Sequence, residues 1–383
     1  MAVLAEVSRS SDDGGSYASH PEDLDVRDAT FTDPDLTTFT RLDGHGLRVV
    51  GQRLEPDRAV LGCRVAQPDP WCRRCGAQGV VRGTVVRELA HEPLGWRPTI
   101  VQVRVPRYRC EGCAHVWRHD ISAAAAPRAK LTRGALRWAL EGIVIGHLSM
   151  ARVAAALGVA WHTANTAVLA EGRALLIADE HRFDGVHVIG VDEHVWRHAR
   201  TGGKYVTVVI DLTPVRAGTG PARLLDVVEG RSKQVFKTWL AARPQAWRAG
   251  VQVVAMDGFA GFKTAAAEEL PDAVAVMDPF HVVRLACDAL DRCRRRVHND
   301  LHGHRARASD PLDKARRTLK QRTADVLAYF ERPGTSNGPT EAINGRLEHL
   351  RGTALGFRNL TNYIARCLLE AGGFRPLLHP HLR

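Results

Sequence analysis

The stretch VHVIGVDEHVW at residues 186–196, followed by KYVTVVIDL at residues 204–212, decides the fold of this chain. Both runs are short and rich in β-branched residues, which predicts strands. A third run, RLLDVVEG, precedes a helical pattern, and then the strand patterns VQVVAMDG (251–258) and AVAVMD (273–278) alternate with another helical one. Strands that come first as a group and then alternate with helices predict a mixed α/β fold, with a mixed sheet flanked by helices.

Acidic residues follow two of these strands. Asp192 ends VHVIGVD and Asp257 ends VQVVAMD, while Glu341 lies in SNGPTEAIN, where Pro339 fits the first position of a helix. Three converging carboxylates can hold two Mg²⁺ or Mn²⁺ ions about 4 Å apart, which activate an attacking oxygen and stabilise the leaving oxygen of a phosphodiester. The alternative is that each acid is an ordinary strand-end or helix-start charge. No Walker-type phosphate loop is visible, so we expect no nucleotide cofactor.

Two CxxC pairs, Cys72–Cys75 and Cys110–Cys113, are separated by a stretch that can form a β-hairpin. Two residues between thiols let both sulfurs of a pair face one ion, and four thiolates complete a structural Zn²⁺ shell. Four ordinary buried cysteines are the alternative, and Cys63 is a competing ligand. We therefore expect a small zinc-binding β domain at residues 46–121.

Residues 149–168 read as a helix-turn-helix, within a domain at residues 128–182. Ser149 can cap the first helix and Gly158 fits the turn. The second helix would present its first residues to the major groove of DNA. The DNA-contacting candidates are Arg152, Trp161, His162, Thr163 and Asn165. Any two short helices joined at a glycine give a similar pattern, so a purely structural pair is the alternative.

The composition favours a polyanionic partner. The chain of 383 residues carries a formal charge of +11, which suggests nucleic acid, although a solvated basic surface is possible. No run of 18 apolar residues suggests a membrane span, and the N-terminus lacks a secretory pattern. We expect a cytoplasmic protein, associated with the bacterial nucleoid, whose residues 1–45 are a flexible segment.

In this order of motifs the chain resembles the ISL3 family of bacterial insertion-sequence transposases, which are of the DDE type. The matching segments run from about residue 45 to 372, and the most specific of them are DPFHVV (278–283), SNGPTEAIN (336–344) and GFRNLTNY (356–363). The resemblance implies an RNase H-like catalytic domain at residues 186–383, with Asp192, Asp257 and Glu341 as its catalytic acids.

The resemblance also implies supporting roles near the acids. Asp278 and His281 would lie close to the site, and His281 would contact the scissile phosphate, transfer a proton or be an ordinary strand-end histidine. Arg231 corresponds to the arginine of the family's GR motif, with a phosphate or structural contact. Asn344, one turn after Glu341, would orient the carboxylate or touch DNA.

One departure from the family pattern concerns the interval between the second and third acids. Glu341 follows Asp257 by only 84 positions, so the family's long helical insertion is shortened here, to about residues 288–328. Residues 292–322 contain eleven Lys or Arg against three Asp, including Arg294, Arg295 and Arg296, and so predict a basic arm that contacts DNA or a solvated helix face.

The main hypothesis is a metal-dependent transposase that cleaves and transfers DNA strands at the inverted repeats of its own element. It would act on double-stranded DNA, as a homodimer in the working complex. A catalytically inactive zinc and helix-turn-helix DNA-binding protein is the alternative, and a structure-selective nuclease is a third, weaker interpretation.

Overall fold

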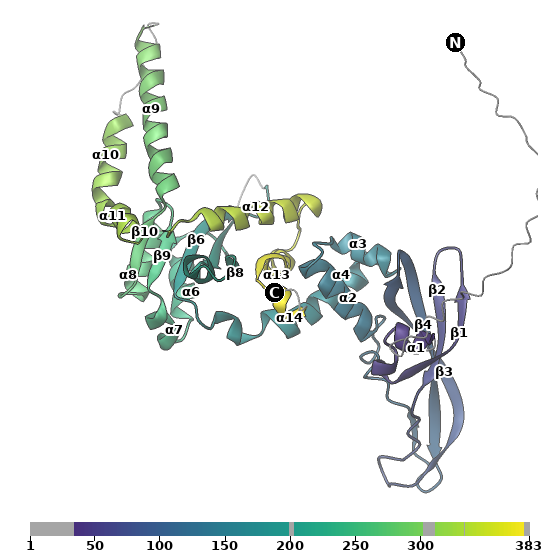
Figure 1. Ribbon diagram of the computed structural model, residues 1–383. Helices are drawn as coiled ribbons and strands as arrows, with labels where there is room; N and C mark the ends of the chain where they lie inside the picture. Colours follow the sequence, from purple (N-terminus) through teal and green to yellow (C-terminus); the bar gives the residue numbers. More distant parts are fainter. Residues whose placement is uncertain (1–33, 199–202, 302–310, 333, 379–383) are drawn as a thin grey trace, which may run out of the picture.

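The computed structural model describes residues 34–198, 203–301, 311–332 and 334–378 (Figure 1). Most of the predicted flexible N-terminal segment and residues 302–310 of the predicted shortened insertion lie outside these ranges. Residues 34–45 differ from the prediction of flexibility, because they form the short helix α1 (Leu36–Phe39) and the turn η1 (Asp43–His45). Leu42 is fully buried against the first sheet, and its apolar burial holds this segment in place.

The first sheet is built from β1 (Leu47–Leu54), β2 (Ala59–Val65), β3 (Gly79–Leu94), β4 (Arg97–Cys110) and β5 (Val116–Arg118). The strand order is β1-β2-β4-β3, with β5 paired to β4. The long β3–β4 hairpin fills the interval between the two cysteine pairs, as the sequence predicts. The inward side chains of this hairpin, Val101 and Val103 among them, pack against Leu61 of β2 and form a separate hydrophobic core.

A helical segment follows. It contains α2 (Arg133–Val144), α3 (Met150–Ala156) and α4 (Trp161–Gly172), which continues as a π-helical turn (Arg173–Ile177) before η3 (Glu180–Phe183). The hydroxyl of Ser149 accepts a hydrogen bond from the backbone N–H of Arg152, and Gly158 has a φ of +64° at the turn, as predicted for both residues. Within the described residues no single helix has the length and apolar character of a membrane span; α3 and α4 with its extension pass that test only as a pair bent by 110°.

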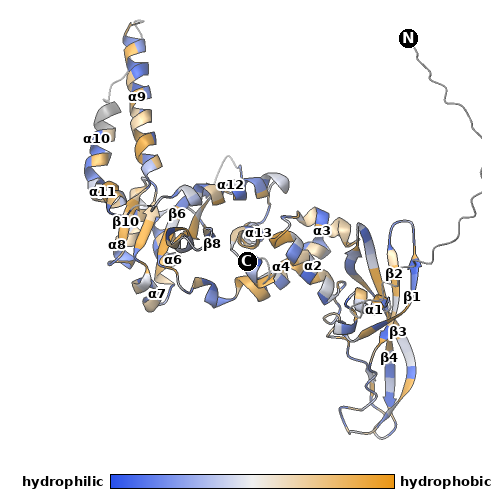
Figure 2. Ribbon diagram, in the orientation of Figure 1, coloured by the Kyte–Doolittle hydropathy of each residue, from blue (hydrophilic) through white to orange (hydrophobic). Residues whose placement is uncertain are grey.

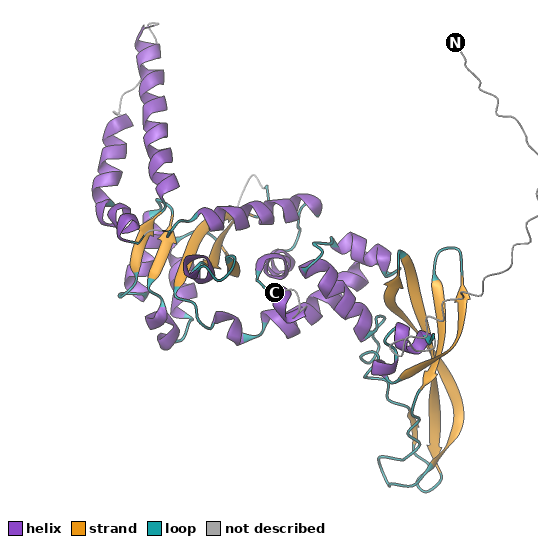
Figure 3. Cartoon of the chain, viewed as in Figure 1, coloured by secondary structure: helices purple, strands orange, loops and turns teal. Residues whose placement is uncertain are grey.

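The second sheet contains β6 (Val188–Val195), β7 (Tyr205–Asp211), β8 (Arg223–Glu229), β9 (Val253–Met256) and β10 (Val274–Met277). Its order is β10-β9-β6-β7-β8, in which β6, β7 and β8 pair antiparallel while β9 and β10 are parallel to β6. This is the mixed α/β arrangement predicted from the strand pattern, and Figure 3 shows its helices around the strands.

Helices cover both faces of the second sheet. On one face lie α6 (Lys233–Ala241) and α8 (Ala260–Glu269), which bury Phe236 and Phe262 against the strands. On the other lie α12 (Gly338–Thr353) and α13 (Leu360–Ala371), whose buried residues join those of α2 and α4 in one core. The helical segment and the second sheet therefore share a hydrophobic core.

The remaining helices are α5 (Thr213–Ala217), α7 (Gln245–Gly250), α9 (Pro279–Leu301), α10 (Pro311–Gln321), α11 (Thr323–Glu331) and α14 (Arg375–Leu378). Helices α9 and α10 project together from the β9–β10 end of the sheet (Figure 1). Figure 2 shows that α9 alternates hydrophilic and hydrophobic residues along its length. This projection is the described part of the predicted basic arm.

Candidate acid site and cysteine centre

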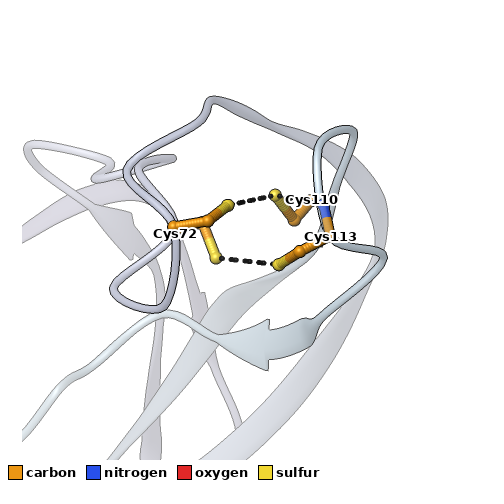
Figure 4. A group of neighbouring side chains, drawn as sticks. Cys72, Cys110 and Cys113 are labelled. Carbon is orange, nitrogen blue, oxygen red and sulfur yellow. Dashed lines mark hydrogen bonds between the residues drawn. The ribbon is translucent and has the colours of Figure 1, made fainter.

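The four cysteines of the CxxC pairs come together at one end of the β3–β4 hairpin. The Sγ atoms of Cys72 and Cys113 are 3.7 Å apart, those of Cys75 and Cys110 are 3.3 Å apart, and all four lie within 4.8 Å of one another (Figure 4). Gly76, with a φ of +75°, makes the turn that closes the first pair. The donor set and its spacing fit a single tetrahedral Zn²⁺ ion.

The cysteine environment also favours metal binding. The backbone N–H of Cys113 donates to the Cys110 sulfur at 3.4 Å and, with the other contacts of that thiol, lowers its pKa to about 7, whereas the neighbouring thiols raise the pKa of Cys75, so that in the absence of metal the four sulfurs share protons. Cys63 lies outside the quartet, because it is buried in β2, where burial raises the pKa of its thiol to about 12. It is therefore a core residue rather than a competing ligand.

The register of the second sheet places the first two acids side by side. Val191 of β6 pairs with Met256 of β9 in a parallel register. The residues that follow them in sequence, Asp192 and Asp257, are therefore neighbours. Asp192 does not end its strand, as the sequence suggested, because β6 continues to Val195 through its antiparallel pairing with β7. The acid site therefore lies where β9 ends and β6 continues beyond it.

Asp192 is 6% exposed and accepts two hydrogen bonds from neutral donors, the backbone N–H of Glu193 at 2.8 Å and Nδ2 of Asn344 at 2.9 Å. The pKa of Asp192 is raised to about 7, mainly by burial and then by the charges of Asp257 and Glu341, while the Glu193 N–H lowers it. The three acids therefore repel one another across the site when all are ionised.

Glu341 enters the site from the first turn of α12, with its side chain 47% exposed. His281, at the start of α9, holds its Nε2 atom 3.9 Å from a Glu341 carboxylate oxygen, and that nitrogen is buried without a hydrogen-bond partner. Within the described ranges the four cysteines bring their ligand atoms within 4.8 Å of one another, whereas the oxygens of the three acids are not grouped so tightly.

Asp278 holds the start of α12 in place. It is 1% exposed directly after β10, and its Oδ1 accepts from the Ser336 hydroxyl at 3.0 Å and from the backbone N–H of Asn337 at 2.9 Å. Asn344 ties the next turn of α12 to Asp192. Two carboxylates on the sheet thus fix the helix that carries Glu341.

Gly190 lets α12 come this close to the sheet. A Cβ at this position of β6 would lie 2.6 Å from the Thr340 hydroxyl and 2.9 Å from Cγ1 of Ile210, closer than real Cβ atoms come, and 3.0 Å from the Asn337 side-chain oxygen. Neither Gly190 nor the Ser336–Asn337 contact was predicted as part of the site. Their only signal in the sequence is position, two residues before Asp192 and at the start of SNGPTEAIN.

The comparisons with known proteins agree with this geometry. A family model described as transposase, of the ISL3 group, matches residues 189–310 and 304–367, a range that holds all three acids. The transposases for insertion sequence element IS1557 of two Mycobacterium tuberculosis strains, CDC 1551 / Oshkosh and ATCC 25618 / H37Rv, are each 29% identical over 263 residues, or 67% of this chain and 53% of theirs. Over residues 189–367 the chain is therefore similar to transposases of the ISL3 family.

The chain spans about half the length of the curated relatives it matches. In the described part of the interval between Asp257 and Glu341, the α9–α10 projection and α11 lie between the two acids. Arg322 anchors that bridge to the site, because it pairs with Asp325 and donates to the Gly258 carbonyl at 3.2 Å, next to Asp257.

Arg231 contacts the residue that follows Asp192 on β6. Its guanidinium is 3.2 Å from a Glu193 carboxylate oxygen and stacks over the ring of Tyr205, with its carbon 3.7 Å from the ring centroid. The structure therefore places Arg231 in a contact within the protein, at the next residue after Asp192.

The residues proposed to contact DNA divide by exposure. Arg152, Trp161 and His162 are exposed on α3 and α4, and Thr163 is half-buried. Asn165 differs from the prediction of an exposed DNA contact, because it is only 8% exposed and faces the interior side of α4. On α9, Arg294 and Arg295 both pair with Asp291 and remain more than 70% exposed, while Arg296 is half-buried.

Proposed function

We propose that this chain is a DDE transposase that cleaves and joins DNA strands at the inverted-repeat ends of an insertion sequence, with Asp192, Asp257 and Glu341 as its catalytic acids. The observation that carries the proposal is the parallel register of β6 and β9, which puts Asp192 beside Asp257 while Asn344 ties the Glu341 helix to Asp192. The strand order, three antiparallel strands followed by two parallel ones, also supports an RNase H-like catalytic domain.

The acids fit a pair of divalent cations, Mg²⁺ or Mn²⁺. Asp192 has only neutral hydrogen-bond donors, and its pKa is raised by burial and then by the charges of Asp257 and Glu341, which a cation would offset. Three carboxylates could hold two ions about 4 Å apart, which would supply activation of the attacking oxygen and stabilisation of the leaving one.

The protein's own residues orient the substrate and the acids. Asp278 and Asn344 act as positioning residues, because they hold α12 and so set where Glu341 reaches. His281 presents a buried nitrogen without a partner beside Glu341, so it is available to a scissile phosphate oxygen or to a proton that moves during strand cleavage.

DNA recognition would be shared between two regions of the chain. The exposed start of α4, with Trp161 and His162, is suited to the major groove of the element ends, and the arginines of α9 are suited to phosphates. A structural Zn²⁺ in the cysteine quartet would stabilise the domain before the helix-turn-helix. Because both element ends must be engaged together, we expect a homodimer in the working complex.

The test is strand cleavage of labelled duplexes taken from the inverted repeats that flank the gene, in Mg²⁺ and in Mn²⁺. Wild type should nick or cut at the element boundary, and Asp192→Asn and Asp257→Asn should lose at least about a thousandfold in rate. Asp272→Asn, which neutralises an exposed acid in the turn before β10, is the matched control and should keep full activity. Cleavage at full rate by Asp192→Asn would refute the assignment of that residue.

The shortened interval before Glu341 and the partial coverage of the relatives favour one alternative, a zinc and helix-turn-helix DNA-binding protein without catalysis. It predicts tight, end-specific binding with no cleavage in either metal. The same labelled duplexes, followed by gel shift and by product analysis, distinguish the two functions.

A further inference from the structure

A cavity of about 540 Å³ lies where the helical segment meets the connection between α12 and α13. The starts of α3 and α4 form one wall, and residues 349–359 form the other. Aromatic and amide side chains share the lining, with Trp161, Asn165, Phe357 and Asn362 among them. A flat aromatic surface next to amide groups is suited to a planar ligand that stacks and hydrogen-bonds along its edge.

The cavity also contains a charged group that lacks an acceptor. Arg366 lines it and is only 3% exposed, and its Nη2 donates to the Leu148 carbonyl at 3.3 Å, while its Nη1 has no hydrogen-bond partner. The nearby carboxylate of Glu370 is engaged by His147 at 2.6 Å. A buried guanidinium N–H without a partner is costly, and an acceptor oxygen or nitrogen on a ligand would satisfy it.

A leucine on the rim of the cavity is almost fully exposed and has a positive φ. Leu355 is 97% exposed and has a φ of +53°, at the position after α12 where glycine is the usual residue. A branched apolar side chain gains nothing in stability from this conformation or from this exposure. Its place at the cavity mouth suggests a contact that forms only when a partner is bound.

We propose that this cavity receives a single base displaced from the DNA duplex, and that Leu355 is the wedge that enters the gap left in the base stack. Apolar side chains are used in this way to unstack base steps, and displaced bases are held by aromatic stacking and edge hydrogen bonds. Trp161 and Phe357 supply the apolar walls, and Asn165 and Arg366 supply the polar contacts. This inference rests on the DNA binding proposed above.

The length of α12 sets where the base would be displaced. Glu341 and Leu355 stand at opposite ends of this helix, 14 residues apart, which at about 1.5 Å per residue is about 21 Å. At about 3.4 Å per base pair this corresponds to about six base pairs. The displaced base is therefore expected about six base pairs from the cleavage position.

The experiment uses the full zinc-loaded chain, in a buffer without Mg²⁺ or Mn²⁺ so that no strand is cut, with flanking inverted-repeat duplexes in which 2-aminopurine replaces one base at a time. The fluorescence of 2-aminopurine rises when this base leaves the stack. On protein binding we therefore expect fluorescence to increase on the order of twofold or more for 2-aminopurine about six base pairs from the cut, and to change little at other positions. Gel shift on the same duplexes and cleavage in Mg²⁺ are measured in parallel.

Two variants separate the wedge from the cavity. Leu355→Gly suits the positive φ and should fold at least as well as wild type, yet lose the 2-aminopurine signal. Ala151→Trp fills the cavity from an exposed position on α3 and should weaken end binding about tenfold. Leu54→Ser removes another exposed leucine, on β1, and should change neither.

A chain that binds and cuts the ends without any 2-aminopurine signal, or a Leu355→Gly variant that keeps the signal, overturns this inference and leaves the transposase proposal standing. A chain that does not bind the ends overturns both.

Discussion

Replacing Asp192 by asparagine should make the protein more stable in the absence of Mg²⁺ and Mn²⁺ while abolishing its activity. Asp192 is 6% exposed, faces Asp257 and Glu341, and has no cationic partner among its hydrogen-bond donors. Asparagine keeps the shape and removes the charge. Asn344, whose Oδ1 has no partner, can turn its amide to accept from the new side chain, so the contact between α12 and β6 survives.

The size of the effect follows from the pKa of Asp192, which rises from an ordinary 3.8 to about 7 on folding. A carboxyl with a raised pKa stabilises the fold fully below its unfolded value, and this stability is lost as the pH rises through the folded value. Each pH unit between the two values corresponds to about 1.36 kcal/mol. Asp192→Asn should therefore gain on the order of 1–2 kcal/mol at pH 5 and about 4 kcal/mol at pH 8.

The assay is urea unfolding of both zinc-loaded proteins without Mg²⁺ or Mn²⁺ at pH 5 and pH 8, followed by the same measurement at pH 8 with Mg²⁺. Divalent cations should stabilise wild type and have little effect on the variant, because they bind the ionised acid cluster. Asp272→Asn serves as the exposed control and should show no pH-dependent gain. A variant that is equally destabilised at both pH values would show that the carboxylate of Asp192 is not strained by its neighbours, and the reasoning would fail.

Three further predictions address the elements that position the site. Cys75→Ser should release the metal and unfold the first sheet, which circular dichroism and a zinc-binding dye would detect; a variant as stable as wild type in the presence of Zn²⁺ would contradict a structural ion. Gly190→Ala should push α12 away from β6 and reduce cleavage by about tenfold or more, with a fold intact by circular dichroism, and unchanged cleavage would show that the close approach is not needed. Asp278→Asn should weaken the hydrogen bond that the side chain at position 278 accepts from the Asn337 N–H, and it should lower the rate of cleavage rather than DNA affinity. A loss of affinity alone would argue against a positioning role.

Local patterns in the sequence predicted local structure well. The CxxC spacing predicted the cysteine quartet, because two intervening residues constrain both sulfurs whatever the rest of the chain does. The Ser149 cap and the Gly158 turn were predicted for the same reason, since each depends on hydrogen bonds and dihedral angles within a few residues. The alternation of strands and helices likewise predicted the mixed second sheet.

The tertiary structure decided what depends on register and burial. The sequence suggested that Asp192 ends its strand, but pairing with β7 extends β6 beyond this residue. On the other side of β6 the partner strand β9 is shorter and ends at Met256, next to Asp192. Asn165 looked exposed on one helix, but the packing of α4 turned it toward the interior.

By itself, the sequence determined which cysteines could share a metal ion, the order of the elements, the likeness to a transposase family and the identity of three candidate acids. Only the tertiary structure decided that Asp278 holds the start of α12, that Gly190 admits it, and that Leu355 stands on the rim of a cavity. The reason is physical: spacing along the chain fixes neighbours within a turn or a hairpin, whereas contacts across 50 or more residues depend on strand register and on which faces are buried.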